Sequence, residues 1–324
     1  MKRIGISGRL PIILACFAAA FSIPAFLGSY DLHVLMLGLL SALVAFSLNF
    51  TLGYVGQPNF GHGALFGFGA YASAIVTVKL GVPFGVSLII GMVVAGVVGL
   101  LVGYITLQLR GAYFCMVTIA IGQVFMLLST NFVPLTGGPM GMAGVSSPTI
   151  FGLDGRQTLW TFAILMLGVM IWLTWMLEKS VVGRAWIDIR ESETLSKALG
   201  INSFRYAMLA YVVGSVFAGA AGSLYAHYVG FVDPTIFAFS WSSMAVVSVA
   251  MGGRGTILGP LVGGLLVTLL PEYFRVASLW RLPMFGLVLI LIITFIPDGL
   301  VKLPQYFKEK RNNKWGKAIM EKTA

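Results

Sequence analysis

The chain has 324 residues, of which 58% are hydrophobic and only 10% charged, and its mean hydropathy is +0.93. A soluble domain is about a quarter charged, so this composition excludes an ordinary soluble protein and predicts one embedded in a membrane. The net charge of +10 does not indicate nucleic-acid binding. The basic residues flank apolar runs, where membrane orientation and anionic lipid account for them.

Apolar runs of membrane-spanning length follow one another along the chain. A bilayer core of about 30 Å takes about 20 residues as a helix, whereas β-barrel strands are shorter and alternate strictly. We therefore predict an all-α, Gly-rich polytopic bundle of about ten transmembrane helices, with eight as the lower bound. The expected spans cover residues 10–27, 34–52, 64–78, 86–107, 114–130, 159–177, 206–228, 237–251, 256–270 and 282–296.

The chain is predicted to be a single transmembrane domain over residues 1–324. Its parts are a membrane bundle at 9–300, a charged loop at 178–205 and a basic tail at 301–324. The first apolar run follows three basic residues, as in a signal peptide, but it is long for a signal core and further spans follow. We interpret it as an uncleaved first span.

Two glycine-containing stretches leave the span count open. Residues 53–63 and 237–255 contain glycines that permit non-helical backbone, so either stretch could be re-entrant, which would lower the count. Other glycines recur at about helical-turn spacing inside expected spans, as at Gly91, Gly99 and Gly263. Such small residues let helix backbones approach closely in lipid, so we expect tight helix packing there.

The loop at 178–205 is the densest charged segment, with nine of the 32 charged residues. With ten spans, seventeen basic residues lie on the side of this loop and of both termini, against four on the other side. The positive-inside rule then places the loop and both termini in the cytoplasm.

Within that loop, residues Glu191 to Leu199 are predicted to form a short helix. Glu193 and Lys197 have the favourable i, i+4 order, and Gly200 suits a left-handed C-cap. Leu195, Ala198 and Leu199 lie on adjacent turns and would make an apolar side. We expect Ser203 to cap the next span. The segment is therefore interpreted as a docking surface for a partner that does not enter the membrane.

No catalytic group is predicted. The span interiors contain almost no ionisable residues, and there is no HExxH, paired-carboxylate or GxxxxGK[ST] pattern. Cys16 and Cys115 lie in apolar runs, which argues against a metal site. We expect a non-enzymatic passive pathway, with no cofactor or metal in this chain, whose energy is supplied from elsewhere.

The richest polar feature at membrane depth is the stretch at 53–63. Its Gln57, Asn59 and His62 could hydrogen-bond a solute or freed backbone carbonyls, although a tight turn without ligand contact is the simpler alternative. Gln123 is a second pathway candidate, and its alternative role is an interhelical hydrogen bond.

Three segments resemble the permease subunits of branched-chain amino acid ATP-binding-cassette importers, specifically the larger M-type subunit. They are GRAWIDIRESETLSKALGINSFRYAMLAYVVGSVFAGAAGSLYAH at 183–227, LGYVGQPNFGHGALFGFGAYASA at 52–74 and MGGRGTILGPLVGG at 251–264. The resemblance implies a bacterial inner-membrane protein paired with an H-type permease. It also implies two cytoplasmic ATPase subunits, which bind ATP and Mg, and a periplasmic binding protein that delivers Leu, Ile or Val.

The resemblance further implies that the charged loop seats in a groove of an ATPase subunit. The coupling residues so implied are Asp188, Arg190, Glu191, Glu193, Leu195, Leu199 and Gly200. Pro58-Asn59 and Arg254 depart from the residues common in the family. Related permeases carry urea, short amides or other amino acids, and these remain alternatives. An ion-coupled secondary carrier is a further alternative, but the buried acids that it would need are absent from the expected spans.

Overall fold

The structure is a computed structural model that describes residues 28–149, 154–275, 280–296 and 299–303, together with Phe21 and Pro24. The expected first span, apart from those two residues, and the basic tail beyond residue 303 lie outside the described part. Within the described ranges the chain is helical except for turns, connections and one pair of two-residue strands. The predicted all-α fold class is confirmed.

The long helices are α2 (Ser29–Asn49), α3 (His62–Leu80), α4 (Phe84–Thr106), α5 (Gly111–Asn131), α7 (Gly155–Lys179) and α10 (Ser203–Val229). The shorter ones are α6 (Val133–Thr136), α8 (Val181–Glu191), α9 (Glu193–Ala198), α11 (Phe239–Gly252), α12 (Gly259–Tyr273) and α13 (Arg281–Phe295). The strands β1 (Met142–Ala143) and β2 (Phe231–Val232) pair antiparallel. A π-helical turn, η2 (Phe50–Tyr54), extends α2 so that the two together cover 26 residues.

The expected count of about ten spans is not supported. Among the described residues, six helices are long and apolar enough to cross a membrane: α2 with η2, α3, α4, α5, α7 and α10. Helices α11, α12 and α13 have only 14 or 15 residues. At 1.5 Å per residue they rise about 21–23 Å, which is less than a bilayer core of about 30 Å. The corresponding expected spans, 237–251, 256–270 and 282–296, had 15 residues each and were counted as full crossings.

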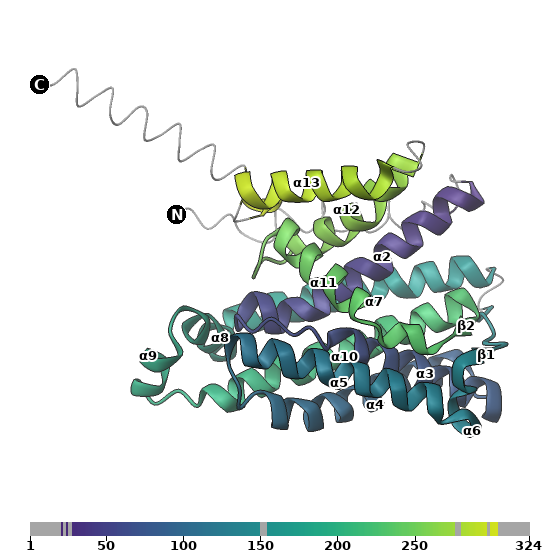
Figure 1. The fold of residues 1–324 in the computed structure, drawn as a ribbon, viewed down its shortest axis with the longest axis horizontal. Helices are drawn as coiled ribbons and strands as arrows, with labels where there is room; N and C mark the ends of the chain where they lie inside the picture. The colour runs from purple at the N-terminus through teal and green to yellow at the C-terminus, as the bar shows by residue number, and fades with distance from the viewer. Residues whose placement is uncertain are drawn as a thin grey trace, which may run out of the picture.

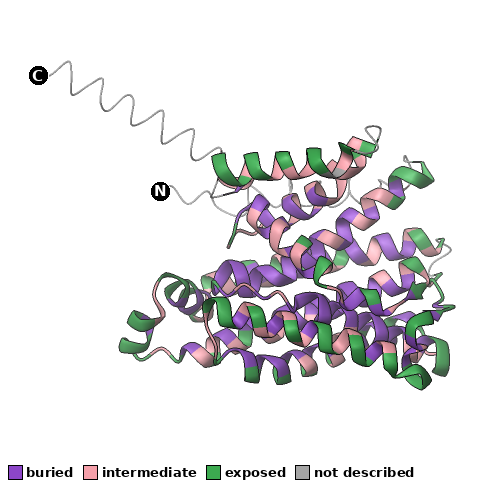
Figure 2. Ribbon diagram, viewed as in Figure 1, coloured by how far each residue is buried: buried purple, intermediate pink, exposed green. Residues whose placement is uncertain are grey.

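The core lies where α3 and α10 pack against each other, with α2 and α4 beside them (Figures 1 and 2). Small residues make this contact. A Cβ added to Gly69 would lie 2.2 Å from the carbonyl oxygen of Gly219, and one added to Gly99 would lie 2.1 Å from the Ser215 hydroxyl. The backbones are therefore in near contact, as the spacing of small residues predicted for the 86–107 span.

Helices α11 and α12 form a tight helical hairpin against α2. A Cβ on Gly263 would lie 1.8 Å from the Ser248 carbonyl oxygen of α11, and one on Gly264 would lie 2.3 Å from Cα of Ala42 in α2. The predicted interruption at 252–255 is present, since α11 ends at Gly252 and α12 begins only at Gly259. This hairpin brings the turn at 253–258 beside the end of α2.

The bundle has two different ends. Helices α8 and α9 form one end, whereas α6 and the β1–β2 pair lie at the opposite end (Figure 1). Exposed residues are concentrated on α9 and on the outward faces of α4, α5 and α13, while α3 and α10 are mostly buried (Figure 2). The charged loop is thus a separate, solvent-accessible cap on a buried helical core.

Candidate functional site: a charged helical cap and a buried polar segment

The charged loop folds as two helices rather than the one expected over 191–199. The break falls at Ser192, whose backbone is extended (φ −160°, ψ 105°). Its hydroxyl oxygen accepts a hydrogen bond from the amide of Leu195 at 3.3 Å and so begins α9. Glu191 belongs to the end of α8. The sequence contained this signal, because serine is a favoured N-cap, but the acidic residues on both sides of it were interpreted as one continuous first turn.

Helix α8 is anchored by its aromatic side. The Trp186 side chain is fully buried, its indole N–H donates to the Tyr206 carbonyl oxygen at 2.7 Å, and its ring packs against Phe50 and Tyr54 of η2. Tyr54 in turn donates to the Glu178 carboxylate at 2.6 Å. Sequence reasoning passed over Trp186, although a tryptophan in an amphipathic helix is a signal for burial.

The predicted C-cap of α9 is present. Gly200 has a φ of +82°, and the amide of Ile201 donates to the carbonyl oxygen of Ser196 at 3.0 Å, as in a Schellman motif. The expected cap of the next helix is wrong by one residue. Asn202 caps α10 by accepting from the amide of Arg205 at 3.1 Å, whereas Ser203 is buried and its hydroxyl has no hydrogen-bond partner.

An apolar ridge covers the outer side of α9. Leu195 is 60% exposed and Leu199 is 72% exposed, and Ala198 between them is also exposed. The helix has only one and a half turns, and its buried residue is Ser196. The expectation that these three residues share one face is met, and that face is uncovered in the isolated subunit.

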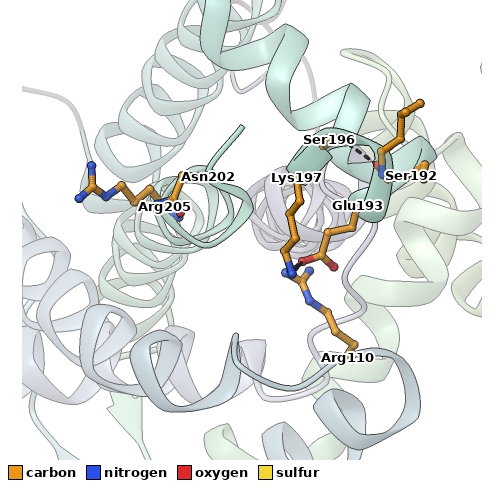
Figure 3. Close-up of polar contacts among 8 residues, drawn as sticks. Arg110, Ser192, Glu193, Ser196, Lys197, Asn202 and Arg205 are labelled. Carbon is orange, nitrogen blue, oxygen red and sulfur yellow. Dashed lines mark hydrogen bonds and ion pairs between the residues drawn. The ribbon is translucent and has the colours of Figure 1, made fainter. Parts of the chain in front are cut away.

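Glu193 ties α9 to the bundle. Its carboxylate lies 3.0 Å from the Lys197 ammonium, the expected i, i+4 pair, and it also pairs with Arg110 (Figure 3). Arg110 lies in the connection between α4 and α5, 83 positions earlier. Burial lowers the pKa of Arg110, and the Glu193 carboxylate opposes that change. The pair therefore places a charge-assisted hydrogen bond between the charged loop and the membrane bundle.

The side chains of the remaining predicted coupling residues, which lie on α8, point in two different directions. Asp188 and Glu191 are exposed on α8, and Glu191 pairs with Arg190 at 3.3 Å. The Arg190 guanidinium, however, reaches inward, and its Nη1 donates to the Gly53 carbonyl oxygen at 2.8 Å. The seven residues therefore do not form one outward surface.

The pathway candidates also separate. Gln57, Asn59 and His62 are buried in and beside the non-helical connection between η2 and α3, whereas Gln123 is exposed on α5. The stretch at 53–63 is therefore a largely buried turn. Helix α5 buries little besides Phe114, Thr118, Gly122 and Ser129. Sequence alone did not distinguish the two environments, because the burial of these polar side chains depends on helices that are distant in the chain.

The buried segment contains polar atoms without partners. Ser47 donates to the Val44 carbonyl oxygen at 2.7 Å, so its hydroxyl accepts from Nε2 of His62 at 2.7 Å. That tautomer leaves Nδ1 of His62 as an acceptor without a partner. Both side-chain polar atoms of Gln57 are also unpaired. The Asn59 amide oxygen accepts from the amide of Gly61 at 2.9 Å and holds the turn, but its amide nitrogen is also unpaired.

Among the described residues, no group of three or more His, Cys, Asp or Glu side chains could hold a metal ion. The polar residues outside the charged cap are mostly neutral serine, threonine, asparagine and histidine side chains bonded to helix backbones or to one another. Together with six helices of spanning length, these features describe a polytopic helical membrane protein.

The chain belongs to the family described as branched-chain amino acid transport system / permease component, which matches residues 32–297. It is 27% identical over 316 residues to the high-affinity branched-chain amino acid transport system permease protein LivM of Escherichia coli K12, covering 90% of this chain and 74% of LivM. It is 28% identical to LivH of Salmonella typhimurium, covering 84% of this chain and 94% of LivH. No solved structure matches the chain.

These comparisons confirm the predicted resemblance to a LivM-like permease of a branched-chain amino acid importer. They also confirm that the chain is a transport component rather than an enzyme. A third relative, the autoinducer 2 import system permease protein LsrC of Yersinia pestis, is 25% identical over 73% of this chain and 64% of its own length. This chain is therefore similar to permeases that are named for different solutes.

Proposed function

We propose that this chain forms half of the membrane pathway of an ATP-binding-cassette importer for the branched-chain amino acids leucine, isoleucine and valine. Membership in the permease family and the likeness to LivM support this function. The observation that carries the mechanism is the exposed ridge of Leu195, Ala198 and Leu199 on α9, at one end of a buried bundle. An apolar ridge on a charged, water-accessible loop favours contact with a soluble partner.

The partner proposed for this ridge is a cytoplasmic ATPase subunit. We call the surface made by Leu195, Ala198 and Leu199, with Asp188 and Glu191 at its charged rim, the docking surface. One copy of the ATPase would seat here and a second would seat on an H-type permease. ATP and Mg would be bound by those subunits, since no phosphate-cradling loop occurs in this chain.

The second permease is proposed to pack on α5. This helix has the smallest buried share of the six spanning helices, and its exposed side carries the amide of Gln123. A lone amide facing lipid is costly, whereas at an interface between two permeases it could face the solute path. A periplasmic binding protein would then deliver the solute at the opposite end, near α6 and the β1–β2 pair.

The proposed solute contacts inside this subunit are Gln57 and His62. The unpaired atoms of the segment comprise two acceptors, Oε1 of Gln57 and Nδ1 of His62, and two donors, Nε2 of Gln57 and Nδ2 of Asn59. Acceptors suit the ammonium of an amino acid and donors suit its carboxylate, so a neutral set of both suits a zwitterion better than a simple ion. Asn59 is assigned the supporting role of holding the turn.

The charge distribution supports a location in the bacterial inner membrane with the docking surface and both termini in the cytoplasm. Five basic residues lie in the loop at 178–205 alone. Two alternatives share the scaffold: a urea or short-amide permease, and a permease for other amino acids. An ion-coupled secondary carrier is disfavoured because the buried polar residues of the described chain include no Asp or Glu.

Reconstitution in proteoliposomes tests the proposal. The chain would be combined with candidate H-type, ATPase and binding-protein subunits, and uptake of labelled leucine would be measured with ATP inside. We expect uptake that requires both ATP and the binding protein. Uptake that persists without ATP and follows a sodium or proton gradient would contradict the importer mechanism. ATP-dependent uptake of urea in preference to leucine would replace the solute and keep the mechanism.

A further inference from the structure

Arg190 links the charged cap to the interior of the bundle. It lies in the last turn of α8, and its Nη1 donates to the carbonyl oxygen of Gly53, in η2, at 2.8 Å. The last carbonyl groups of a helix lack partners within the helix, so this acceptor is available. The side chain is 32% exposed, and a hydrogen bond from a guanidinium at such a half-buried site is stronger than one between neutral groups.

The same guanidinium touches the turn between α11 and α12. A Cβ added to Gly255 would lie 2.5 Å from Nη1 of Arg190 and 2.8 Å from the Gly53 carbonyl oxygen. Gly56, which has a φ of +80°, likewise passes beneath the side chain, since its Cβ would lie 2.9 Å from Cγ of Arg190. Arg190 therefore meets the backbones of two segments that are about 200 residues apart in sequence.

Asn49 fastens those two segments to each other. Its side-chain amide nitrogen donates to the carbonyl oxygen of Thr256 at 3.1 Å, and its amide oxygen accepts from the backbone N–H of Gly255 at 3.0 Å. The residue is fully buried at the end of α2. Both polar atoms of one side chain are thus satisfied by one turn, which fixes the turn on the end of α2.

The turn is also joined firmly to α12. The Thr256 hydroxyl donates to the Gly253 carbonyl oxygen at 2.8 Å and accepts from the amide of Gly259, the first residue of α12, at 3.0 Å. The contacts among Gly53, Gly255 and Asn49 are made by backbone or by a fully bonded amide. The contacts between Arg190 and α12 therefore run through backbone groups and hydrogen-bonded side chains. A displacement of Arg190 is then expected to move α12 as well.

We propose that Arg190 is a positioning residue that transmits movement of α8 to the joined ends of α2 and α12, and through them to the buried segment that carries Gln57. The proposal rests on the proposed docking of an ATPase on the α8–α9 cap. Trp186 holds α8 against η2 by apolar contact, which resists separation of the two helices but allows them to slide past each other. Arg190 supplies the directional contact. Gln57 lies four residues after Gly53, so movement of that carbonyl repositions the candidate solute contact.

The transport test compares Arg190→Gln with Arg190→Lys and with a control, Arg184→Gln. Arg184 is an exposed arginine on the same helix and has no place in the docking surface. In the fully reconstituted importer, we expect Arg190→Gln to retain ATPase co-purification and ATP hydrolysis, while leucine taken up per ATP falls about tenfold, a typical coupling factor. Arg190→Lys should recover part of the leucine taken up per ATP. A lysine ammonium can reach one acceptor, but it lacks the parallel N–H donors of a guanidinium. An unchanged ratio in Arg190→Gln would overturn the proposal.

A distance measurement separates transmission from simple loss of structure. Spin labels would be placed, after replacement of Cys16 and Cys115 by serine, at Ile187 in α8 or at Arg254 in the turn. Each label is paired with one at Leu209 in α10, and all three positions are exposed. We expect both distances to change on ATP trapping in the otherwise unchanged importer, and only the α8 distance to change with Arg190→Gln. If the distance between Arg254 and Leu209 still changes in Arg190→Gln, Arg190 does not transmit the movement of α8. If α8 itself does not move in the unchanged importer, the proposed docking fails instead.

Discussion

Nη1 of Arg190 lies 2.8 Å from the carbonyl oxygen of Gly53, 137 positions away along the chain. This contact divides the predicted coupling residues into two groups with different tasks. Leu195 and Leu199 face outward and are free to meet a partner, whereas Arg190 faces the bundle. Four predictions test this division and the buried polar segment.

Leu199→Asp should abolish binding of the ATPase without unfolding the chain. Leu199 is 72% exposed, so an aspartate there remains hydrated and costs little stability, within about 0.5 kcal/mol. In a docked complex the same carboxylate would be buried against an apolar groove without a partner. Co-purification of the ATPase measures the effect. Met140→Asp, at an 86% exposed site at the opposite end, is the control and should bind the ATPase normally. Normal assembly of Leu199→Asp would rule out the docking surface.

The Arg110–Glu193 pair should contribute modestly to stability. Both side chains are partly exposed, and double-mutant cycles of such pairs usually give about 0.2–1 kcal/mol. A double-mutant cycle with Arg110→Gln and Glu193→Gln, measured by thermal unfolding in detergent, should give a coupling energy in that range that declines with added salt. A coupling indistinguishable from zero at low salt would mean that α9 is not held to the α4–α5 connection by this pair.

Gln57→Leu and Asn59→Leu should differ in a diagnostic way. Both polar atoms of Gln57 are buried and unpaired, so their removal should leave thermal stability unchanged or raised. Leucine uptake should nevertheless fall, because a solute contact is lost. Asn59→Leu removes the hydrogen bond to Gly61 and should lower stability by about 1 kcal/mol. Unfolding temperatures and leucine uptake, measured on both variants, test these two expectations. Full uptake by Gln57→Leu would remove Gln57 from the pathway.

Gly53→Ala should be strongly destabilising. A Cβ there would lie 1.8 Å from Oδ1 of Asn49 and 2.5 Å from the amide nitrogen of Gly255, so the turn must separate from α2. Overpacking of this kind typically costs about 1–3 kcal/mol. Gly286→Ala in α13 is the matched control. Its Cβ would meet nothing within 4 Å, and alanine should favour the helix by up to about 1 kcal/mol. Yield of folded protein by size-exclusion chromatography and the unfolding temperature report both effects. Equal behaviour of the two variants would show that the Asn49 junction is loose.

The sequence by itself determined the features that depend on local chemistry. Composition sufficed to identify a helical membrane protein, and the resemblance of three segments pointed to the permease family. The left-handed conformation at Gly200 and the apolar side of α9 also followed from short-range patterns, because capping and helical periodicity act within a few residues.

Only the tertiary structure decided which polar residues have partners and where helices stop. The span count was wrong because three expected spans of 15 residues were counted, although their helices α11, α12 and α13 are shorter than a bilayer core. Arg190 and Glu191 are adjacent charged candidates in sequence, yet the Arg190 side chain reaches the Gly53 carbonyl oxygen while the Glu191 side chain is 72% exposed. Arg110 and Glu193 meet because α5 begins beside α9, and Gln57 is buried while Gln123 faces outward. Such facts depend on contacts between residues far apart in the chain, which local propensity and periodicity do not encode.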